Sequence, residues 1–280
     1  MSTTKDFATV LMLDGVQHDA SKPVVCASSP SLMRGEGIFE AFLVGDSLPT
    51  ALLDDHDARL CLSARLAGFE IQPGDLKSRL QQFLPLITDG EWRVRCTILR
   101  GEDGHQHWMF SAGPEQPTPD SVILCISDFR LDPLDPMAGA KTISRATHQR
   151  ARALAIEQGA FEAIFLTIDG DIAEGTSTNI FVYQDGVVST PPLSRGILGG
   201  VTRQNILRAC ESEGIKCCER QVSLRDLELA DEIFVTNAVI GVTPVTKILN
   251  IREVLPGSRG SKLKQVQSAY RRHLNSMLQK

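Results

Sequence analysis

The stretch from residue 163 to residue 182 constrains the fold of this chain more than any other. An apolar run at 163–168 is followed by an Asp-Gly turn and then by a second apolar run that ends at Gly186. Two apolar runs around an Asp-Gly turn are typical of a β-hairpin. Between them lies Glu-Gly-Thr-Ser-Thr-Asn at 174–179, whose small polar side chains leave room for a ligand and supply hydrogen bonds. A polar strand entrance with Glu174 in solvent would show the same pattern.

The sequence Glu-Gly-Thr-Ser-Thr-Asn-Ile-Phe at 174–181 resembles the signature of the class IV aminotransferases, which are pyridoxal-phosphate (PLP) enzymes of fold type IV. Further segments of that family occur in the right order from about residue 32 to residue 245. The family includes branched-chain aminotransferases, D-amino acid aminotransferases and aminodeoxychorismate lyases. The resemblance implies an α/β (α+β) fold of two domains, with the cofactor in the cleft between them.

The length of 280 residues allows one large domain or two domains of ordinary size. Two Asp-Pro pairs without periodicity, at 132–133 and 135–136, predict a linker between two domains. We therefore predict a smaller N-terminal α/β domain at 1–127, a linker at 128–135 and a larger C-terminal PLP-binding domain at 136–280.

Composition excludes several classes of protein. A content of 42% apolar and 22% charged residues predicts a globular protein with a sizeable core, and the net charge of −5 does not favour nucleic acid or anionic membranes as partners. The first 20 residues do not resemble a signal peptide, and no apolar run approaches the roughly 18 residues of a membrane span. Seven scattered cysteines without a Cys-x-x-Cys pair indicate reduced thiols and no metal site. We expect a cytoplasmic protein.

Lys141 is the candidate catalytic residue. In the family, the lysine that binds the cofactor covalently precedes a Gly-x-x-Glu-Ala strand, and Lys141 precedes Glu162 by 21 positions (162 − 141) without a gap. The family commonly has Asn three residues after this lysine, where this chain has Ser144. An amine whose pKa is lowered by partial burial would also suit proton transfer. Lys216 and Lys247 are the rival candidates.

The cofactor ring and its phosphate have separate candidate groups. The resemblance assigns Glu174 to the pyridine nitrogen and Arg59, in the His-x-x-Arg-Leu motif at 56–60, to the phosphate; taken alone, Arg59 would be read as a surface residue. Gly199-Gly200 before a helix start predicts a phosphate cradle of backbone N–H groups, although simple capping by Thr202 would give the same pattern. The cofactor-binding candidates are Arg59, Glu174, Asn179, Val201, Thr202, Asn237 and Ala238.

The candidate substrate-binding residues are Phe39, Arg34, His105 and His107. Phe39 belongs to a Gly-x-Gly-x-Phe-Glu segment that borders the active site in the family. The segment 101–119 is rich in Gly, Pro and His, and we predict an irregular loop that serves as a substrate lid. Relatives can bind a substrate carboxylate through an Arg in this loop, where this chain has His105, a weaker and pH-dependent anion partner. This difference predicts an altered substrate, or a carboxylate bound elsewhere, for example by Arg34.

Two reactions remain open. The signature at 174–181 and Phe39-Glu40 favour an aminotransferase that uses a small or branched-chain amino acid and a 2-oxo acid. The Asn237-Ala238 pair favours an aminodeoxychorismate lyase, which forms 4-aminobenzoate and pyruvate for folate synthesis. Remoter alternatives are a non-catalytic relative that binds PLP or phosphate, and an unrelated sugar-phosphate binder. The resemblance also implies a homodimer, and we expect no nucleic-acid, membrane or metal partner.

Overall fold

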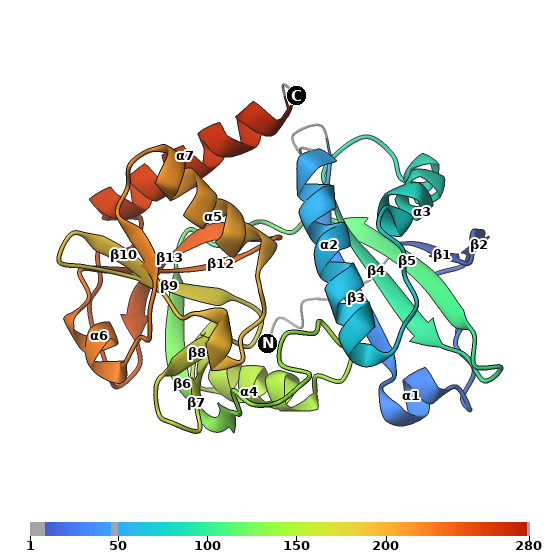
Figure 1. Ribbon diagram of the computed structural model, residues 1–280, viewed down its shortest axis with the longest axis horizontal. Coiled ribbons are helices and arrows are strands. Elements are labelled where there is room, and N and C mark those ends of the chain that lie inside the picture. The colour runs from blue at the N-terminus through green and yellow to red at the C-terminus, as the bar shows by residue number, and fades with distance from the viewer. Residues whose placement is uncertain (1–8, 46–49, 279–280) are drawn as a thin grey trace. The chain divides into compact units, whose positions relative to one another are not determined.

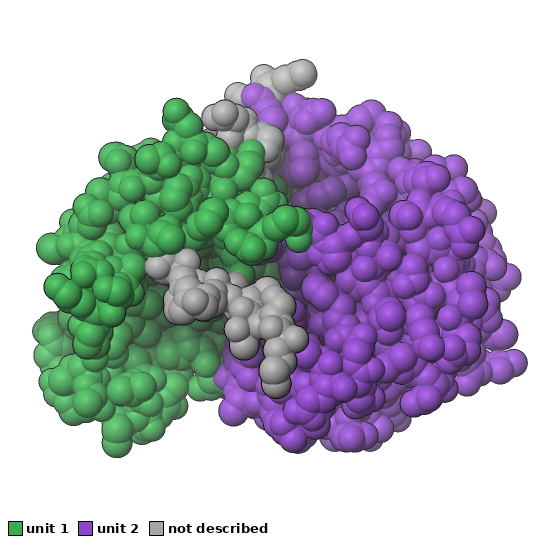
Figure 2. Space-filling view, turned by 180° about the vertical axis from the view of Figure 1, so that it is seen from behind, with its two compact units in different colours: residues 1–117, 140–144 green, residues 118–139, 145–280 purple. Residues whose placement is uncertain are grey.

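The computed structural model describes residues 9–45 and 50–278. The chain forms two compact units (Figure 2): unit 1 comprises residues 1–117 and 140–144, and unit 2 comprises residues 118–139 and 145–280. The predicted domains begin and end in residues 1–8 and 279–280, which lie outside the described residues. Each unit has its own sheet, and together they confirm the predicted mixed α/β class.

Unit 1 is built on a five-stranded antiparallel sheet in the order β2-β1-β5-β4-β3 (Figure 1). Helix α2 packs against β3 and α3. The elements of unit 1 are β1 (Val10–Leu13), β2 (Val16–His18), α1 (Pro30–Arg34), β3 (Gly37–Val44), α2 (Thr50–Ala67), α3 (Asp75–Phe83), the 3-10 turn η1 (Leu84–Leu86), β4 (Trp92–Arg100) and β5 (Gln106–Pro114).

The core of unit 1 follows from apolar spacing in its helices and strands. Leu76, Leu80 and Phe83 recur at three- and four-residue intervals, so one face of α3 is buried against the sheet. Leu60 of α2 lies in the same cluster, and the rings of Phe83 and Phe110 stack with centroids 5.5 Å apart. The cluster holds α2 and α3 against the sheet.

The predicted irregular loop and lid at 101–119 is wrong, because β5 occupies the middle of this segment, Gln106–Pro114. This strand pairs with β1 on one side and with β4 on the other, so it is a central strand of the sheet. Trp108, Phe110 and Ala112 point into the core, while the residues between them are partly exposed. This alternation has the two-residue period of a strand, and Gly and Pro occur before the strand, in its last two positions and after it.

Unit 2 is built on an eight-stranded mixed sheet in the order β11-β10-β9-β12-β13-β6-β7-β8. Pairs β10–β11, β13–β6 and β6–β7 are parallel, and the remaining neighbours are antiparallel. Its elements are β6 (Val122–Leu131), α4 (Ala146–Glu157), β7 (Glu162–Thr167), β8 (Ile172–Gly175), β9 (Asn179–Gln184), β10 (Val187–Thr190), η2 (Leu193–Arg195), α5 (Val201–Ser212), β11 (Cys217–Glu219), α6 (Leu224–Leu229), β12 (Glu232–Asn237), β13 (Gly241–Ile248), η3 (Gly257–Arg259) and α7 (Ser261–Leu278).

The central strands of unit 2 are buried on both faces, which explains their continuous apolar runs. Ile180 and Val182 of β9 belong to one apolar cluster, while Phe181 between them belongs to another. Helices α5 and α7 pack together over the Phe181 side, where the ring of Phe181 stacks on Phe234 with centroids 5.1 Å apart. Helix α4 packs against β6 and β7. None of the helices in the described ranges 9–45 and 50–278 has the length and apolar character to cross a bilayer.

The stretch at 163–182 folds as three strands. The Asp-Gly turn joins β7 to β8, and Gly170 adopts a φ of 93°, which favours glycine. A short loop at 176–178 then leads to β9, which pairs with β10 and β12. The antiparallel hairpin is therefore β7–β8, and the Glu-Gly-Thr-Ser-Thr-Asn segment lies at its far end.

The boundaries of the two units differ from the predicted domain boundaries at 127/128 and 135/136. Strand β6 continues to Leu131 and pairs with β7 and β13, so the first half of the expected linker is part of the sheet of unit 2. Residues 140–144 return to unit 1, where Thr142 forms a bridge with Ile38. Because residues 140–144 are part of unit 1, Lys141 lies in unit 1.

Candidate active site

Lys141 is held in unit 1 by contacts of its backbone. Its amide N donates to Ser63 Oγ of α2 at 3.0 Å, and its carbonyl accepts from Phe39 N of β3 at 2.9 Å. Its Nζ lies 4.6 Å from the centroid of the Phe39 ring. A helix and a strand therefore fix the position from which this amine extends.

The rival lysines have ordinary surface settings in unit 2. Lys216 is exposed, and Lys247 is partly buried, as Lys141 is, but forms an ion pair with Glu253 at 2.7 Å. Lys141 is partly buried and lies beside an aromatic ring. Lys141 remains the predicted catalytic residue.

Arg59 forms a bidentate ion pair with Glu40. The sequence did not identify this carboxylate as its partner. Arg59 Nε donates to Glu40 Oε1 at 2.7 Å, and its Nη2 donates to Glu40 Oε2 at 2.6 Å. His56 Nδ1 lies 2.8 Å from Glu40 Oε2. All three side chains are buried, with 9%, 0% and 2% of Arg59, Glu40 and His56 exposed. The charge of Arg59 is therefore already compensated inside unit 1.

The charges of this cluster follow from its surroundings. Burial alone would raise the pKa of Glu40, but the Arg59 charge and the hydrogen bonds from Arg59 and His56 hold it well below the ordinary range. Burial lowers the pKa of His56, and the charges of Arg59 and Lys141 lower it further, against the opposing effect of Glu40. At neutral pH the cluster consists of an ionised Glu40, a charged Arg59 and a neutral His56.

Glu174 lies at the end of β8 with 9% of the residue exposed. Its Oε2 accepts from Asn179 Nδ2 at 3.1 Å and from the backbone N of Leu198 at 3.1 Å. Asn179 Nδ2 also donates to the Leu198 carbonyl at 3.0 Å. The structure thus brings Glu174 and Asn179 together, and it excludes the alternative of a solvated Glu174.

The N-terminus of α5 has no side-chain cap, and its N-cap residue is Gly200. Capping by Thr202 is therefore wrong, because Thr202 lies inside the first turn and is buried, as is Val201. A Cβ at Gly200 would overlap Asn179 Oδ1, so glycine is required there by close packing. Uncapped N–H groups and the helix dipole can bind an anion such as a phosphate.

Asn237 and Ala238 lie at the end of β12, and both are partly buried. Asn237 Nδ2 donates to the Ser177 carbonyl at 3.2 Å, and its Oδ1 accepts from the backbone N of Val239 and Ile240, each at 2.8 Å. These bonds shape the turn into β13 and tie it to the loop at 176–178. Asn237 is thus connected to the segment between Glu174 and Asn179.

Two of the candidate substrate residues lie in or beside β3. Phe39 is buried, and the guanidinium carbon of Arg95 lies 3.7 Å from the centroid of its ring. Arg34, in the last turn of α1, is largely exposed and donates through Nε to Glu36 Oε1 at 2.6 Å. Arg34 therefore has a carboxylate partner already.

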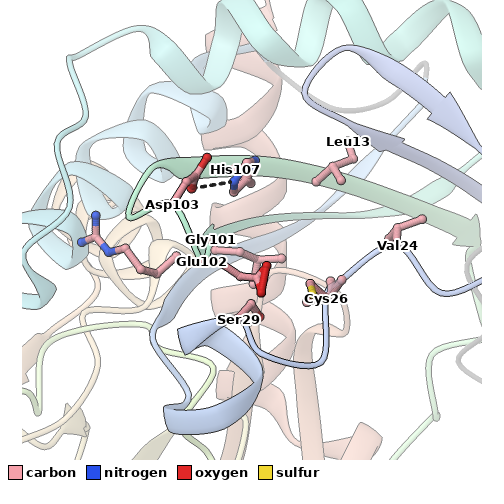
Figure 3. Close-up of a pocket in the computed structure, with 11 residues that line it drawn as sticks. Leu13, Val24, Cys26, Ser29, Gly101, Glu102, Asp103 and His107 are labelled. Carbon is pink, nitrogen blue, oxygen red and sulfur yellow. Dashed lines mark ion pairs between the residues drawn. The ribbon is translucent and has the colours of Figure 1, made fainter.

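A pocket with a volume of about 290 Å³ opens in unit 1 between the β1 and β5 region and the segment before α1 (Figure 3). Leu13 and Val24 contribute apolar walls, and Asp103 and His107 contribute ionisable groups. His107 Nδ1 lies 2.7 Å from Asp14 Oδ2, and its Nε2 lies 3.5 Å from Asp103 Oδ1. The hydrogen bond with Asp14 raises the pKa of His107, against a smaller effect of burial.

His105 is exposed in the turn before β5, and its backbone N donates to Asp103 Oδ1 at 2.9 Å. The other basic residue of the pocket, Arg100, donates to the carbonyls of Gly104 and Gly68 at 3.3 and 2.7 Å. The cation of His107, when it forms, faces two carboxylates. The lining of the pocket is therefore not a strong site for a substrate carboxylate.

Sequence reasoning missed three polar groups that position these candidates: Ser63 beneath Lys141, Glu40 on Arg59, and Glu162 beneath the loop at 176–178. Glu40 and Glu162 both belong to sequence motifs of the family, but a motif does not show which donors surround a carboxylate. Among the described residues, no group of three or more His, Cys, Asp or Glu side chains could hold a metal ion.

The residues present fit a phosphorylated pyridine aldehyde. Such a cofactor needs an amine, a carboxylate and an anion site: Lys141 of unit 1 is a partly buried amine, and unit 2 holds the buried carboxylate of Glu174 and a helix start that can bind an anion. Gly200 at the start of α5 packs closely against Asn179, which also binds Glu174.

The family model of amino-transferase class IV matches residues 37–248, which is most of the chain. This protein therefore belongs to the class IV aminotransferase family, whose members use PLP. The matched residues include parts of both units and every candidate cofactor-binding residue.

Two relatives show the range of reactions in this family. The chain is 29% identical over 276 residues to a D-alanine aminotransferase of Bacillus licheniformis, covering 92% of this chain and 95% of the relative. It is 26% identical over 290 residues to an aminodeoxychorismate lyase of Bacillus subtilis, covering 96% of each. Both matches span nearly the whole chain, so identity at this level does not separate the two reactions.

Solved structures show the same fold. A branched-chain aminotransferase from Thermoproteus uzoniensis, solved with norvaline, matches with a TM-score of 0.85 and 26% identity over 96% of this chain and 95% of that chain. A hypothetical aminotransferase from Mycobacterium tuberculosis in its PLP-bound form matches in fold with a TM-score of 0.83, at 23% identity over 95% of this chain and 99% of that chain. The fold is that of the fold-type IV PLP enzymes.

Proposed function

We propose that this protein is a PLP-dependent aminotransferase that transfers an amino group between a small or branched-chain amino acid and a 2-oxo acid. The observation that carries the proposal is the buried carboxylate of Glu174, held by Asn179 and by the backbone of Leu198 in the family-matched region. Such a fixed carboxylate suits the ring nitrogen of the cofactor. The amino acid and 2-oxo acid are the substrate classes that the family implies.

When bound, PLP supplies an electron sink that stabilises negative charge at the substrate Cα. In this proposal, Lys141 would hold the aldehyde of the cofactor through its Nζ, and the same amine would accept the proton removed from the substrate Cα and return it. The backbone contacts of Lys141 to Ser63 and Phe39 keep the amine oriented during that transfer. Glu174 keeps a proton on the ring nitrogen, because a carboxylate stabilises the pyridinium form.

The phosphate anchor in this proposal is the start of α5. Its N–H groups, with the backbone of Val201 and the hydroxyl of Thr202, bind the anion. Arg59 adds positive charge from unit 1, and Glu40 fixes the orientation of its guanidinium. Because Glu40 compensates Arg59, we assign the larger share of phosphate binding to α5.

The preference for an apolar substrate rests on two candidate substrate residues, Phe39 and His107. The Phe39 ring offers an apolar surface beside Lys141. His107 faces Asp14 and Asp103, so a substrate with a second carboxylate is disfavoured there. Arg34 and His105 remain candidates for the substrate carboxylate, and the charge of Arg34 is shared with Glu36. We further propose that the enzyme is cytoplasmic.

An aminodeoxychorismate lyase is the second candidate function. It is favoured by the Asn237-Ala238 pair and by the match to the lyase of Bacillus subtilis. The bonds of Asn237 to the 176–178 loop tie this pair to the candidate cofactor carboxylate.

A pair of assays separates the two functions. In one reaction the purified holoenzyme receives aminodeoxychorismate without a 2-oxo acid, and in the other it receives branched-chain amino acids or D- or L-alanine with 2-oxoglutarate or pyruvate. We expect amino transfer in the second reaction and no 4-aminobenzoate in the first. Release of 4-aminobenzoate and pyruvate, without amino transfer, would establish the lyase instead.

A further inference from the structure

The loop at 176–178 is folded around one buried carboxylate, that of Glu162. Glu162 is the first residue of β7 and has no exposed surface. Its Oε1 accepts from the backbone N of Thr176 at 3.0 Å, from the hydroxyl of the same residue, and from Ala163 N at 3.1 Å. One oxygen of the carboxylate, Oε1, thus binds Thr176, the first residue of the loop.

The second oxygen of Glu162 binds the rest of the loop. Oε2 accepts from the backbone N of Ser177 at 3.0 Å, from Ser177 Oγ at 2.8 Å and from Thr178 Oγ1 at 3.3 Å. Arg152 Nη1 lies 3.8 Å from the same oxygen and donates to Ser177 Oγ at 3.2 Å. The three consecutive hydroxyl residues of the signature therefore all turn inward to one acceptor.

Other groups bind the outer side of this loop. The Thr176 carbonyl accepts from Arg145 Nη2, and the Ser177 carbonyl accepts from Asn237 Nδ2 at 3.2 Å. A Cβ at Gly175 would overlap Thr178 Oγ1, so the loop closes tightly onto the end of β8. The loop is consequently a fixed link between Glu174 on β8 and Asn179 at the start of β9.

We propose that Glu162 is a positioning residue for the cofactor carboxylate: through the 176–178 loop it sets the distance between Glu174 and Asn179. The inference rests on the proposed role of Glu174 at the ring nitrogen. Asn179 donates to Glu174 Oε2 and also packs against Gly200 at the start of α5. A shift of the loop would therefore move the ring anchor and the phosphate anchor together.

Only an acceptor without protons suits this position. Six N–H and O–H groups converge on the two oxygens of Glu162. Glutamine has the same shape, but its amide would direct two N–H groups at donors. The loop of a Glu162→Gln variant would therefore be displaced even though the volume of the side chain is unchanged.

Glu232 offers a matched control. It is also a buried carboxylate at the first position of a strand, β12, and it accepts from the backbone N of Lys262 at 3.0 Å and of Leu263 at 2.7 Å. It holds the start of α7 and makes no hydrogen bond recorded in the structure to the 176–178 loop. Glu232→Gln therefore removes a structural carboxylate of the same kind without disturbing that loop.

The experiment compares wild type, Glu162→Gln and Glu232→Gln by apoprotein melting temperature, PLP dissociation constant and visible spectrum of the holoprotein. We expect both variants to melt earlier. Only Glu162→Gln is expected to bind PLP at least about tenfold more weakly and to shift its visible absorption, because a misplaced Glu174 loses a charge-assisted bond to the ring. Equal PLP affinity and equal spectra in the two variants would overturn the inference.

A milder variant covers the case in which Glu162→Gln does not fold. Thr178→Val keeps the shape of the side chain and removes one hydroxyl from Glu162. A weakened PLP affinity with a shifted spectrum supports the inference, and an unchanged holoprotein contradicts it. Wild-type protein that binds no PLP would instead refute the proposed function, so the two failures are distinguishable.

Discussion

At the scale of single residues, the pairing of Arg59 with Glu40 changes what a mutation is expected to do. An arginine that only bound the cofactor phosphate could be removed without effect on the apoprotein. Arg59 also compensates Glu40, a carboxylate with no exposed surface. Removal of one partner of a buried ion pair leaves an uncompensated charge and costs about 3–5 kcal/mol.

We therefore expect Arg59→Ala to lower the free energy of unfolding of the apoprotein by about 3–5 kcal/mol at neutral pH, in addition to weakening PLP binding. Urea unfolding of the apoprotein measures the first effect, and PLP titration measures the second. Arg65→Ala is the matched control, because Arg65 is exposed on the same helix, α2. If Arg59→Ala weakened PLP binding but left the apoprotein stability unchanged, Arg59 would bind the phosphate without stabilising the buried charge of Glu40.

The His107–Asp14 pair predicts a dependence of stability on pH. Asp14 raises the pKa of His107 above its ordinary value of 6.5, so the pair stabilises the folded state most fully below pH 6.5. This contribution is lost as the pH rises through the raised pKa of folded His107. Asp103 also faces His107 and adds to the same effect. The pair is partly exposed, so solvent screening reduces its contribution.

In Asp14→Asn, the NMR titration of His107 should move to lower pH. The stability difference between wild type and Asp14→Asn should be larger at pH 5.5 than at pH 8.5. Asp14 also accepts from the backbone N of Trp108 at 2.8 Å, which contributes a difference that does not vary over this range. A stability difference between wild type and Asp14→Asn that stays constant from pH 5.5 to pH 8.5 would show that Asp14 does not raise the pKa of His107.

At the scale of elements, the start of α5 and the loop at 176–178 meet at Asn179. The sequence predicted a helix that starts after Gly199 and Gly200, and this helix is α5. The sequence could not separate capping by Thr202 from an uncapped start, because the two differ by one or two residues in the helix boundary. The structure places the N-cap at Gly200, so no side chain of the N-cap residue caps this helix.

Gly200→Ala tests this element. Gly200 has an ordinary φ of −62°, so alanine is acceptable to the backbone, but its Cβ would overlap Asn179 Oδ1. We expect PLP affinity to fall by about tenfold, because Asn179 and the first N–H groups of α5 must shift. Gly199→Ala is the control, since a Cβ there meets only Leu193 Cδ2 at 3.8 Å within 4 Å. Equal PLP affinities in the two variants would contradict this role of Gly200.

The wrong prediction of an irregular loop at 101–119 concerns a single element, the strand β5. Gly, Pro and His content suggested a loop, yet the alternation of Trp108, Phe110 and Ala112 carries the two-residue period of a strand. A strand in the middle of a sheet tolerates polar residues such as His107 where its other face meets solvent or a pocket.

At the scale of the whole molecule, the sequence predicted the fold class and the family, because several motifs occur in order along most of the chain. It did not predict the limits of the two units. The assignment of β6 to unit 2 depends on pairing with β7 and β13, and the second of these partners lies more than one hundred residues away. The hydrogen-bond partners of Glu40 and Glu162 could not be predicted either, because local sequence patterns do not show contacts between residues far apart in the chain.

The resemblance also predicts a homodimer, which a single chain does not test. Sedimentation of the holoprotein at micromolar concentration should give twice the mass of one chain. Sedimentation as a monomer with full activity would contradict the expected dimer without affecting the assignment of Lys141.

The central claim is that this chain binds PLP covalently through Lys141. Reduction of the purified holoprotein with borohydride fixes the cofactor to its lysine, and peptide mass spectrometry then locates the pyridoxyl group. We predict the adduct on Lys141, and its loss in Lys141→Ala together with the visible absorption of the bound cofactor. An adduct on Lys216 or Lys247, or a holoprotein that carries no adduct after reduction, would contradict the account.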